Sequence, residues 1–262
     1  MTSAQPQFIS SAANPLLKDL RRLAQDSTGY RKQGRIWLEG DHLCRAANER
    51  GVQPSLALFA QGYWDAHSVE WSMALAGARC VVIADALFAG LSALESPAHM
   101  GFVVELPSAP AIQAITPSVI LDRVQDAGNV GAILRSAAAF GFRQVIAIKG
   151  TAALWSPKVL RAGMGAHFGL TLIEGIEAAA LEVLAVPVIA TSSHEGELLH
   201  RAVLPWPCAW VLGHEGQGVS ADLASRAALT VRIVQPGGEE SLNVASAAAI
   251  CLHASAAAAS VR

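Results

Sequence analysis

Short apolar runs alternate with helical stretches throughout the second half of the chain. Five of these runs have the length of strands, and they lie at residues 118–122, 144–148, 187–190, 209–212 and 229–234. Helical patterns lie between most of them, including residues 131–140 and, after a loop, residues 156–164. Strands separated by helices pair in parallel, because each helix carries the chain back to the same end of the sheet. The pattern therefore predicts a doubly wound α/β domain.

The first part of the chain predicts a second, smaller α/β domain. Its strand-like runs lie at residues 36–38, 55–59 and 80–83, with helical segments between them. Near the start, Asn14-Pro15 precedes a helical pattern with four leucines on one face, namely Leu16, Leu17, Leu20 and Leu23. A Pro/Ser/Ala stretch at residues 106–110 is typical of a linker. We therefore predict domains at residues 1–106 and 107–262.

The distribution of charge along the chain indicates one candidate nucleic-acid-binding segment. The chain has 262 residues and a formal net charge of only -2, so it is not a globally basic nucleic-acid binder. Residues 18–35 nevertheless carry many basic side chains, namely Lys18, Arg21, Arg22, Arg31, Lys32 and Arg35, against Asp19 and Asp26. This segment is either a solvated helix face followed by a loop or a local phosphate-binding patch.

Cysteine, histidine and hydropathy patterns exclude several classes of protein. Cys44, Cys80, Cys208 and Cys251 lie far apart without a C-x-x-C pair, which predicts reduced, buried thiols. The eight histidines form no H-x-x-x-H pair, so we expect no metal. The first ten residues lack the pattern of a secretion signal, and the longest small-apolar run, 244–259, is shorter than the roughly 20 residues a bilayer span needs. We expect a cytoplasmic protein with no membrane partner.

The first of three candidate motifs is NVGAILR, at residues 129–135. It follows a turn-prone cluster at a predicted helix start, so Asn129 is either the helix N-cap or a functional side chain. Gly131 leaves room for a nucleotide to approach the backbone, and Arg135 would point its planar guanidinium at a phosphate or ribose. Alternatively, Arg135 is an ordinary surface residue of the helix.

The second and third motifs are GHEGQG, at residues 213–218, and SLNVASAA, at residues 241–248. The former follows a strand, and its three glycines permit close approach of a ligand. Its spacing is not G-x-G-x-x-G, which argues against a nucleotide-binding oxidoreductase. The latter opens an Ala-rich helix, where Asn243 is either an N-cap or a ribose ligand and Ser241 either a cap or a group that positions a nucleotide.

In order and spacing, these motifs resemble those of the SpoU (TrmH-type) RNA 2'-O-ribose methyltransferases of the SPOUT superfamily. The resemblance implies a carboxy-terminal parallel-sheet domain with a trefoil knot. Residues 9–11, 14–18 and 31–40 further resemble the amino-terminal L30e-like domain of the family, which binds the RNA substrate. A homodimer is implied as well. Because members with this domain often act on ribosomal RNA, we expect rRNA before tRNA as the partner.

The resemblance assigns roles residue by residue. The positions matching catalytic residues are Asn129, Arg135, Glu215, Ser241 and Asn243. The cofactor is S-adenosyl-L-methionine, with contacts expected from Thr191, Ser192, Leu212, Gly213, Gly218, Ile233, Gln235, Ser241 and Leu242. RNA contacts are expected from Arg31, Lys32 and Arg35, and from Lys158 and Arg161 in an extension of the first motif. Glu215 either binds loop amides or faces the substrate, and His214 receives no role.

Chemistry qualifies the role of Arg135. In the family the matching arginine is proposed to activate the ribose hydroxyl, but an arginine is effectively never deprotonated in a protein. We therefore expect Arg135 to bind the neighbouring phosphate and orient the hydroxyl.

Three alternatives accompany this hypothesis: a tRNA 2'-O-methyltransferase, a SPOUT enzyme that methylates a base, and a non-catalytic RNA-binding protein with a vestigial methyltransferase domain. One segment, SPAHMG at residues 96–101, departs from the family's Thr-Pro-Gln-Gly and is expected to join the domains.

Overall fold

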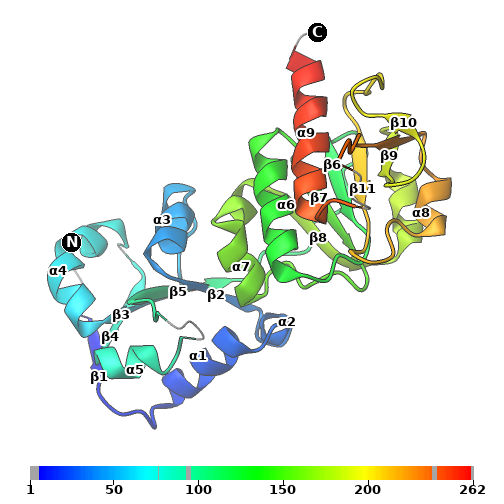
Figure 1. The fold of residues 1–262 in the computed structure, drawn as a ribbon. Helices are drawn as coiled ribbons and strands as arrows, with labels where there is room; N and C mark the ends of the chain where they lie inside the picture. Colours follow the sequence, from blue (N-terminus) through cyan, green and yellow to red (C-terminus); the bar gives the residue numbers. More distant parts are fainter. Residues whose placement is uncertain (1–5, 76, 93–95, 238–240, 261–262) are drawn as a thin grey trace. The chain divides into compact units, whose positions relative to one another are not determined.

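The computed structural model describes residues 6–75, 77–92, 96–237 and 241–260. The chain forms two compact units, one of residues 1–108 with 155–168 and the other of residues 109–154 with 169–262 (Figure 1). The predicted boundary after residue 106 lies close to the end of the first segment. Residues 155–168, which the sequence placed in the second domain, pack with the first unit instead.

The first unit contains a five-stranded mixed sheet. Its strand order is β1-β4-β3-β5-β2. The strands are β1 (Gln7–Ile9), β2 (Arg35–Glu39), β3 (Leu56–Ala60), β4 (Arg79–Ile83) and β5 (Met100–Glu105). β1, β4 and β3 pair in parallel, whereas β5 is antiparallel to both β3 and β2.

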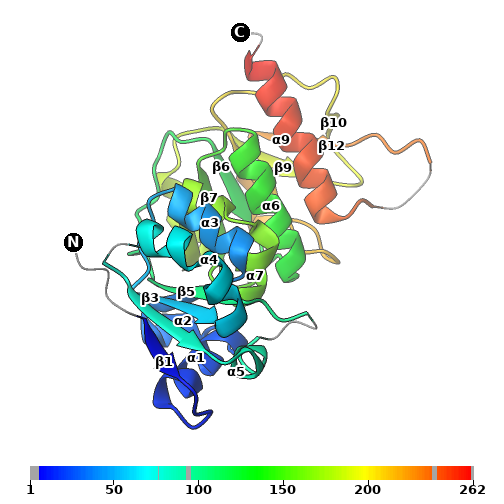
Figure 2. The same cartoon turned by 90° about the vertical axis from the view of Figure 1, so that its left-hand side faces the viewer.

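Helices cover both faces of this sheet. They are α1 (Pro15–Gln25), α2 (Gly29–Gln33), α3 (Asp41–Glu49), α4 (Gln61–Ala74), α5 (Asp85–Ala89) and α7 (Pro157–Gly163). α1 and α5 lie on one face, and α3 and α4 lie on the other (Figures 1 and 2). Asn14 caps α1 by accepting the Leu16 N–H at 2.9 Å. Leu17, Leu20 and Leu23 are buried as predicted, while Leu16 is only half-buried because it lies at the edge of the apolar face.

Two strands of this unit were missing from the sequence prediction. β1 has only three residues, and β5 begins within the segment that was expected to join the domains. That expectation is wrong, because Gly101 lies in the middle of the sheet. A Cβ at Gly101 would lie 2.3 Å from the Trp37 ring, so this position has space only for glycine. The pairing partner that makes β5 a central strand is distant in sequence, and local patterns did not reveal it.

The second unit contains a seven-stranded sheet in which every neighbouring pair is parallel. The order is β10-β12-β9-β11-β6-β7-β8. The strands are β6 (Ser118–Leu121), β7 (Gln144–Ile148), β8 (Thr171–Ile176), β9 (Val188–Thr191), β10 (Glu197–Leu198), β11 (Ala209–Leu212) and β12 (Leu229–Arg232). The predicted parallel α/β fold is confirmed. The sequence prediction missed β8, which lies at an edge and carries a glutamate and a glycine, and the two-residue β10.

Helices also cover both faces of the second sheet. α6 (Ala127–Ala139) and α9 (Val244–Ser260) lie side by side on one face, and the Trp210 indole of β11 donates a hydrogen bond to Ser255 of α9 at 2.9 Å (Figures 1 and 2). On the other face, Ile120 and Val211 share a core with Leu181 of the 3-10 helix Ala178–Val183 and Leu223 of α8 (Ala221–Ser225). Central strands are buried on both faces, which explains their continuous apolar runs.

Burial agrees with the prediction for most of the cysteines. Cys44, Cys208 and Cys251 are buried free thiols, whereas Cys80 is half-buried. Burial raises the pKa of Cys208 to about 11 and that of Cys251 to about 12, so both are protonated near neutral pH. Among the helices that the structure describes, none is both long and apolar enough to span a membrane.

Candidate active site

Four loops meet at one edge of the parallel sheet in the second unit. β12, β9, β11 and β6 are consecutive neighbours, and their register pairs Leu212 with Leu121 and Thr191 with Val231. The carboxyl ends of parallel strands lie at the same edge, where open α/β sheets bind their ligands. The first two motifs begin near this edge, the first in the opening turn of α6 and the second in the loop that follows β11.

Glu215 connects the second motif to the first. Its carboxylate accepts the backbone N–H of Gln125 at 3.1 Å and of Asp126 at 3.0 Å, and the side-chain amide of Asn129 at 3.2 Å. Although partial burial opposes ionisation, the N–H groups of Asp126 and Gln125 hold the pKa of Glu215 below its ordinary value. Of the two roles predicted for Glu215, the structure shows the binding of loop amides.

Asn129 does not cap the helix in which it lies. α6 begins two residues earlier, at Ala127, and the Asp126 side chain caps it by accepting the Asn129 N–H at 2.7 Å. The alternative in which Asn129 serves as the N-cap is wrong, because the turn-prone residues before it already belong to the cap and first turn. Its side chain is free to link the motifs.

Asn243 connects the third motif to Asn129 of the first motif. Its side-chain oxygen accepts the N–H groups of Ala245 at 2.9 Å and Ser246 at 3.2 Å, so it caps α9. Its side-chain nitrogen donates to the Asn129 side-chain oxygen at 2.9 Å. Because Asn243 supplies this cap, the alternative role of Ser241 as the helix cap is wrong. The three motifs are thus joined by a polar chain, Glu215–Asn129–Asn243.

The second motif folds into a closed turn. His214 and Gly218 exchange two backbone hydrogen bonds, of 3.0 and 2.8 Å, and the His214 ring accepts the Gly216 N–H at 3.0 Å. His214 therefore supports the turn, a role that the sequence did not reveal. A Cβ at Gly213 would lie 2.1 Å from the backbone carbon of Gly218, so the loop crosses itself closely there.

The remaining cofactor candidates lie along the same group of loops. Thr191 donates from its hydroxyl to the Val211 carbonyl at 3.1 Å, and the Ser192 hydroxyl accepts the N–H groups of His194 and Glu195, both at 3.2 Å. Leu212 is buried at the end of β11. β12 ends at Arg232, so Ile233 and Gln235 lie in the loop beyond it, and Ser241 and Leu242 are exposed before α9.

One buried polar atom among the cofactor candidates lacks a hydrogen-bond partner within the described residues. The side-chain oxygen of Gln235 is buried and accepts no hydrogen bond within the described part of the chain. A buried acceptor without a donor is costly unless a ligand supplies one.

Arg135 lies apart from the polar chain. It is exposed on α6 and lines a groove with Ser136 and Ala139 of the same helix, Phe140 just after it, and Ala249 of α9. Within the described residues, no hydrogen bond or ion pair joins Arg135 to Glu215, Asn129 or Asn243. Its guanidinium remains accessible to a phosphate.

The predicted RNA-binding residues of the first unit fall into two groups. Lys32 and Lys158 are exposed. Arg35 instead pairs with Asp19 at 2.8 Å, and Arg161 pairs at 3.3 Å with the buried Glu39. Arg31, although exposed, donates to the Tyr30 hydroxyl at 3.0 Å.

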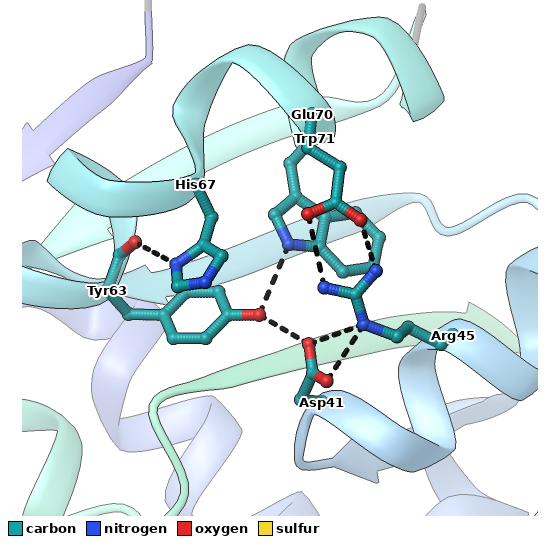
Figure 3. Close-up of polar contacts among 6 residues, drawn as sticks. All are labelled: Asp41, Arg45, Tyr63, His67, Glu70 and Trp71. Carbon is teal, nitrogen blue, oxygen red and sulfur yellow. Dashed lines mark hydrogen bonds and ion pairs between the residues drawn. The ribbon is translucent and has the colours of Figure 1, made fainter.

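A second polar cluster, which the sequence analysis did not predict, lies between α3 and α4. Arg45 binds the Asp41 carboxylate, pairs with Glu70, and lies with its guanidinium carbon 5.0 Å from the centre of the Trp71 ring (Figure 3). Tyr63 donates to Asp41. Hydrogen bonding to Arg45 holds the pKa of Glu70 below its ordinary value. Its two carboxylates outnumber its one guanidinium, so the cluster is slightly acidic, which leaves the α1–α2 side as the more basic part of the unit.

No group of three or more His, Cys, Asp or Glu side chains is arranged to hold a metal ion in the described ranges.

Comparison with known proteins identifies the family. The model of the SpoU rRNA Methylase family matches residues 117–253, which is more than half of the chain and contains all three motifs. The chain belongs to this family. The resemblance inferred from the motifs is thereby confirmed, and with it the expected class, the S-adenosylmethionine-dependent rRNA and tRNA methyltransferases.

Two relatives match this chain over nearly its whole length. The 23S rRNA (guanosine(2553)-2'-O)-methyltransferase RlmP of Bacillus subtilis is 28% identical, and the match covers 94% of this chain and 97% of that protein. The uncharacterized tRNA/rRNA methyltransferase slr1673 of Synechocystis is 30% identical over 94% of this chain and 92% of its own length.

Solved structures share the fold of this SpoU protein. An RNA 2'-O ribose methyltransferase aligns with a TM-score of 0.80 and 27% identity, over 97% of this chain and 99% of that one. The AdoMet-bound rRNA methyltransferase of Sinorhizobium meliloti aligns with a TM-score of 0.82 and 24% identity, over 96% and 98% of the two chains.

Proposed function

We propose that this protein transfers a methyl group from S-adenosylmethionine to a ribose 2'-hydroxyl of ribosomal RNA. The observation that carries the proposal is the polar chain Glu215–Asn129–Asn243, because it joins all three family motifs at the ligand-binding edge of the parallel sheet. The preference for rRNA is supported by RlmP, whose name describes this reaction on 23S rRNA.

The residues around this edge fit the cofactor. Gly213 allows the turn to cross itself closely, which shapes the loop at this edge, and the exposed Leu242 offers apolar contact, whereas Leu212 is fully buried beneath the loop. The unpartnered oxygen of Gln235 suits a donor group such as an amine of the cofactor. Thr191, Ser192, Gly218, Ile233 and Ser241 would complete the pocket. When bound, S-adenosylmethionine supplies a methyl group activated by its sulfonium charge.

The chain's own part in the reaction is orientation. Glu215 and Asn243 hold Asn129 from both sides, which gives the site a defined shape before the RNA arrives. Arg135 binds a phosphate next to the target through its permanent charge and orients the hydroxyl. The hydroxyl proton passes to solvent water late in the transfer, when the oxygen has become strongly acidic, so no strong base is needed at this position.

Replacing Arg135 separates methyl transfer from cofactor binding. We expect Arg135→Ala to reduce methyl transfer about 100-fold or more, the scale of a positioned charge lost from a reacting site, and to leave cofactor affinity within a few-fold. Arg143 is a suitable control, because it is an exposed arginine before β7, at the opposite edge of the sheet. Calorimetry that finds no affinity for S-adenosylmethionine in the folded wild type would remove the proposal.

A tRNA substrate is the second candidate, supported by the mixed naming of slr1673. Mapping 2'-O-methyl sites in total RNA with and without the gene distinguishes the two: a site lost from rRNA supports our proposal, and a site lost only from tRNA contradicts it.

Three further properties belong to the proposal. We infer a trefoil knot in the carboxy-terminal domain, an L30e-like fold and RNA-binding role for the amino-terminal domain, and a cytoplasmic homodimer in which Arg135 or groups near it complete the partner's site. The separation of Arg135 from the polar chain supports a shared site, and the small residues of α9 permit close packing between subunits.

A further inference from the structure

We infer that Arg123, supported by the buried Asp122, is a positioning residue that holds the loop of residues 213–220 in its cofactor-binding shape. No motif includes this pair. The inference rests on the proposed function, because that loop contains Gly213 and Gly218, which are both proposed to line the cofactor pocket.

The backbone of Arg123 is the first observation. Its φ is 59°, in the left-handed region that residues with a side chain rarely adopt. Such a conformation is strained and persists only where surrounding contacts impose it. Here the Thr151 hydroxyl accepts the Arg123 N–H at 3.1 Å and donates to the Leu121 carbonyl at 2.9 Å. The loop after β7 therefore keeps the end of β6 in this unusual turn.

The direction of the side chain is the second observation. Gly150, also in the loop after β7, leaves room for the Arg123 stem, because a Cβ there would lie 3.2 Å from Arg123 Cγ. The guanidinium donates from Nε to Asp122 at 3.0 Å and from Nη1 to the Gln217 side-chain oxygen at 3.0 Å. Gln217 is otherwise an exposed side chain near the tip of the turn.

Asp122 completes the arrangement. Its side chain is 2% exposed, and its second oxygen accepts the Ser220 N–H at 2.6 Å. The turn is thus held at its beginning by Glu215, at its tip by Gln217 and at its end by Ser220. Each contact reaches back to residues 122–129, so the strained turn at Arg123 determines where the second motif lies relative to the first.

The test compares cofactor affinity in variants that keep the backbone turn. Asparagine tolerates left-handed φ, so Arg123→Asn removes the guanidinium without adding strain. We expect its Kd for S-adenosylmethionine to rise about tenfold, as for a lost hydrogen bond to a charged group. The kcat at saturating cofactor should change less than threefold, and the affinity for RNA should stay unchanged. Arg143→Ala, which removes an arginine at the opposite edge, should leave all three values unchanged.

Gln217 variants show whether Arg123 acts through this contact. Gln217→Leu should weaken cofactor binding about as much as Arg123→Asn, while Gln217→Glu, which keeps the acceptor, should bind normally. In the double variant Arg123→Asn/Gln217→Leu, the loss should be no greater than in either single variant.

The outcomes separate this inference from the proposed function. Wild-type protein that binds no S-adenosylmethionine contradicts the proposed function itself. Wild-type binding with unchanged affinity in Arg123→Asn and Gln217→Leu, or additive losses in the double variant, overturns the positioning role alone. Should Arg123→Asn fail to fold, the exposed Gln217 variants still decide the question.

Discussion

Single side chains at this site act mainly by holding one another. Glu215 accepts three hydrogen bonds from residues 125–129, one of them from Asn129 of the first motif, and Asn243 divides its amide between capping α9 and binding Asn129. A carboxylate that receives backbone N–H groups is stabilised in its ionised form. The ionisation of Glu215 is therefore linked to the stability of the loops.

Acid should loosen the loops through Glu215. Its pKa in the folded protein is lowered from an ordinary value of 4.5, so its contribution to stability is fully present above about pH 4.5 and is lost as the pH falls through the folded pKa. We expect Glu215→Gln to lower the unfolding midpoint at pH 7 and to differ progressively less from the wild type below pH 4.5. Thermal unfolding of both proteins between pH 7 and pH 3 measures this. A difference that does not vary with pH would contradict the assignment.

Loops and helix ends are the elements on which the site depends. The turn after β11 needs glycine where its backbone crosses itself, and α9 needs a polar cap at Asn243, near the start of the third motif. Both requirements come from the backbone, since N–H groups in the first turn of a helix have no partner within it. Two substitutions examine these elements separately.

Gly213→Ala should disrupt the turn itself. The added methyl would meet backbone atoms of Gly218 and Val219 at 2.1 to 2.2 Å, which no side-chain rotation relieves. We expect a lower unfolding midpoint and the loss of cofactor affinity. Gly216→Ala is the matched control in the same turn, because its nearest neighbour would be the His214 ring at 3.9 Å. Equal effects of the two substitutions would show that crowding at Gly213 is unimportant.

Asn243 serves two purposes that can be separated. Asn243→Ala should cost about 1 kcal/mol of stability through loss of the helix cap and should also reduce methyl transfer. Serine caps helices but lacks the amide donor, so Asn243→Ser should recover most of the stability without recovering activity. Chemical denaturation and a methyl-transfer assay measure the two effects. Full activity in Asn243→Ser would show that the contact with Asn129 is dispensable.

At the scale of the whole molecule, the distribution of charge matters more than its sum. The chain is slightly acidic, yet basic residues gather on α1 and α2, while the guanidinium of Arg45 is paired with two carboxylates. Paired arginines are less available to RNA, because an RNA contact must first break the existing ion pair. Lys32 is exposed and thus a better probe of RNA binding than Arg35.

Removing basic residues from this segment should flatten the salt dependence of RNA binding. Fewer counterions are released when fewer phosphates are neutralised. We expect the slope of log affinity against log salt to fall by about one unit for each lost phosphate contact, with Lys32→Ala giving a larger effect than Arg35→Ala. The triple alanine variant at Arg31, Lys32 and Arg35 should combine these losses. Arg50→Ala, an exposed arginine at the end of α3, is the control. An unchanged slope in the triple variant would direct attention to Lys158.

The proposed dimer is also a property of the whole molecule. If Arg135 completes the site of a partner subunit, mixing inactive Arg135→Ala with inactive Asn129→Ala should restore part of the activity, because one mixed site contains both native residues. Sedimentation should show a dimer at micromolar concentration. A fully active monomer would rule out the shared site.

The sequence by itself determined the class of the protein. Apolar runs separated by helices predicted the parallel sheet of the second unit, because a strand buried on both faces has a continuous apolar run whatever its neighbours are. The three motifs identified the family, since each consists of residues adjacent in the chain. Short or edge strands such as β1, β8 and β10 escaped detection, because their local patterns differ little from those of loops.

Only the tertiary structure decided which distant residues meet. The polar chain joins positions 86 and 114 residues apart, and the contact between Arg123 and Gln217 spans 94. Likewise, residues 155–168 leave the second unit to pack with the first, where Arg161 pairs with Glu39. The hydrophobic periodicity of a segment indicates only which of its own faces is buried. The partner of a side chain depends on which segments the folded backbone brings together, and so the roles of Glu215, Arg123 and Arg161 became visible only in three dimensions.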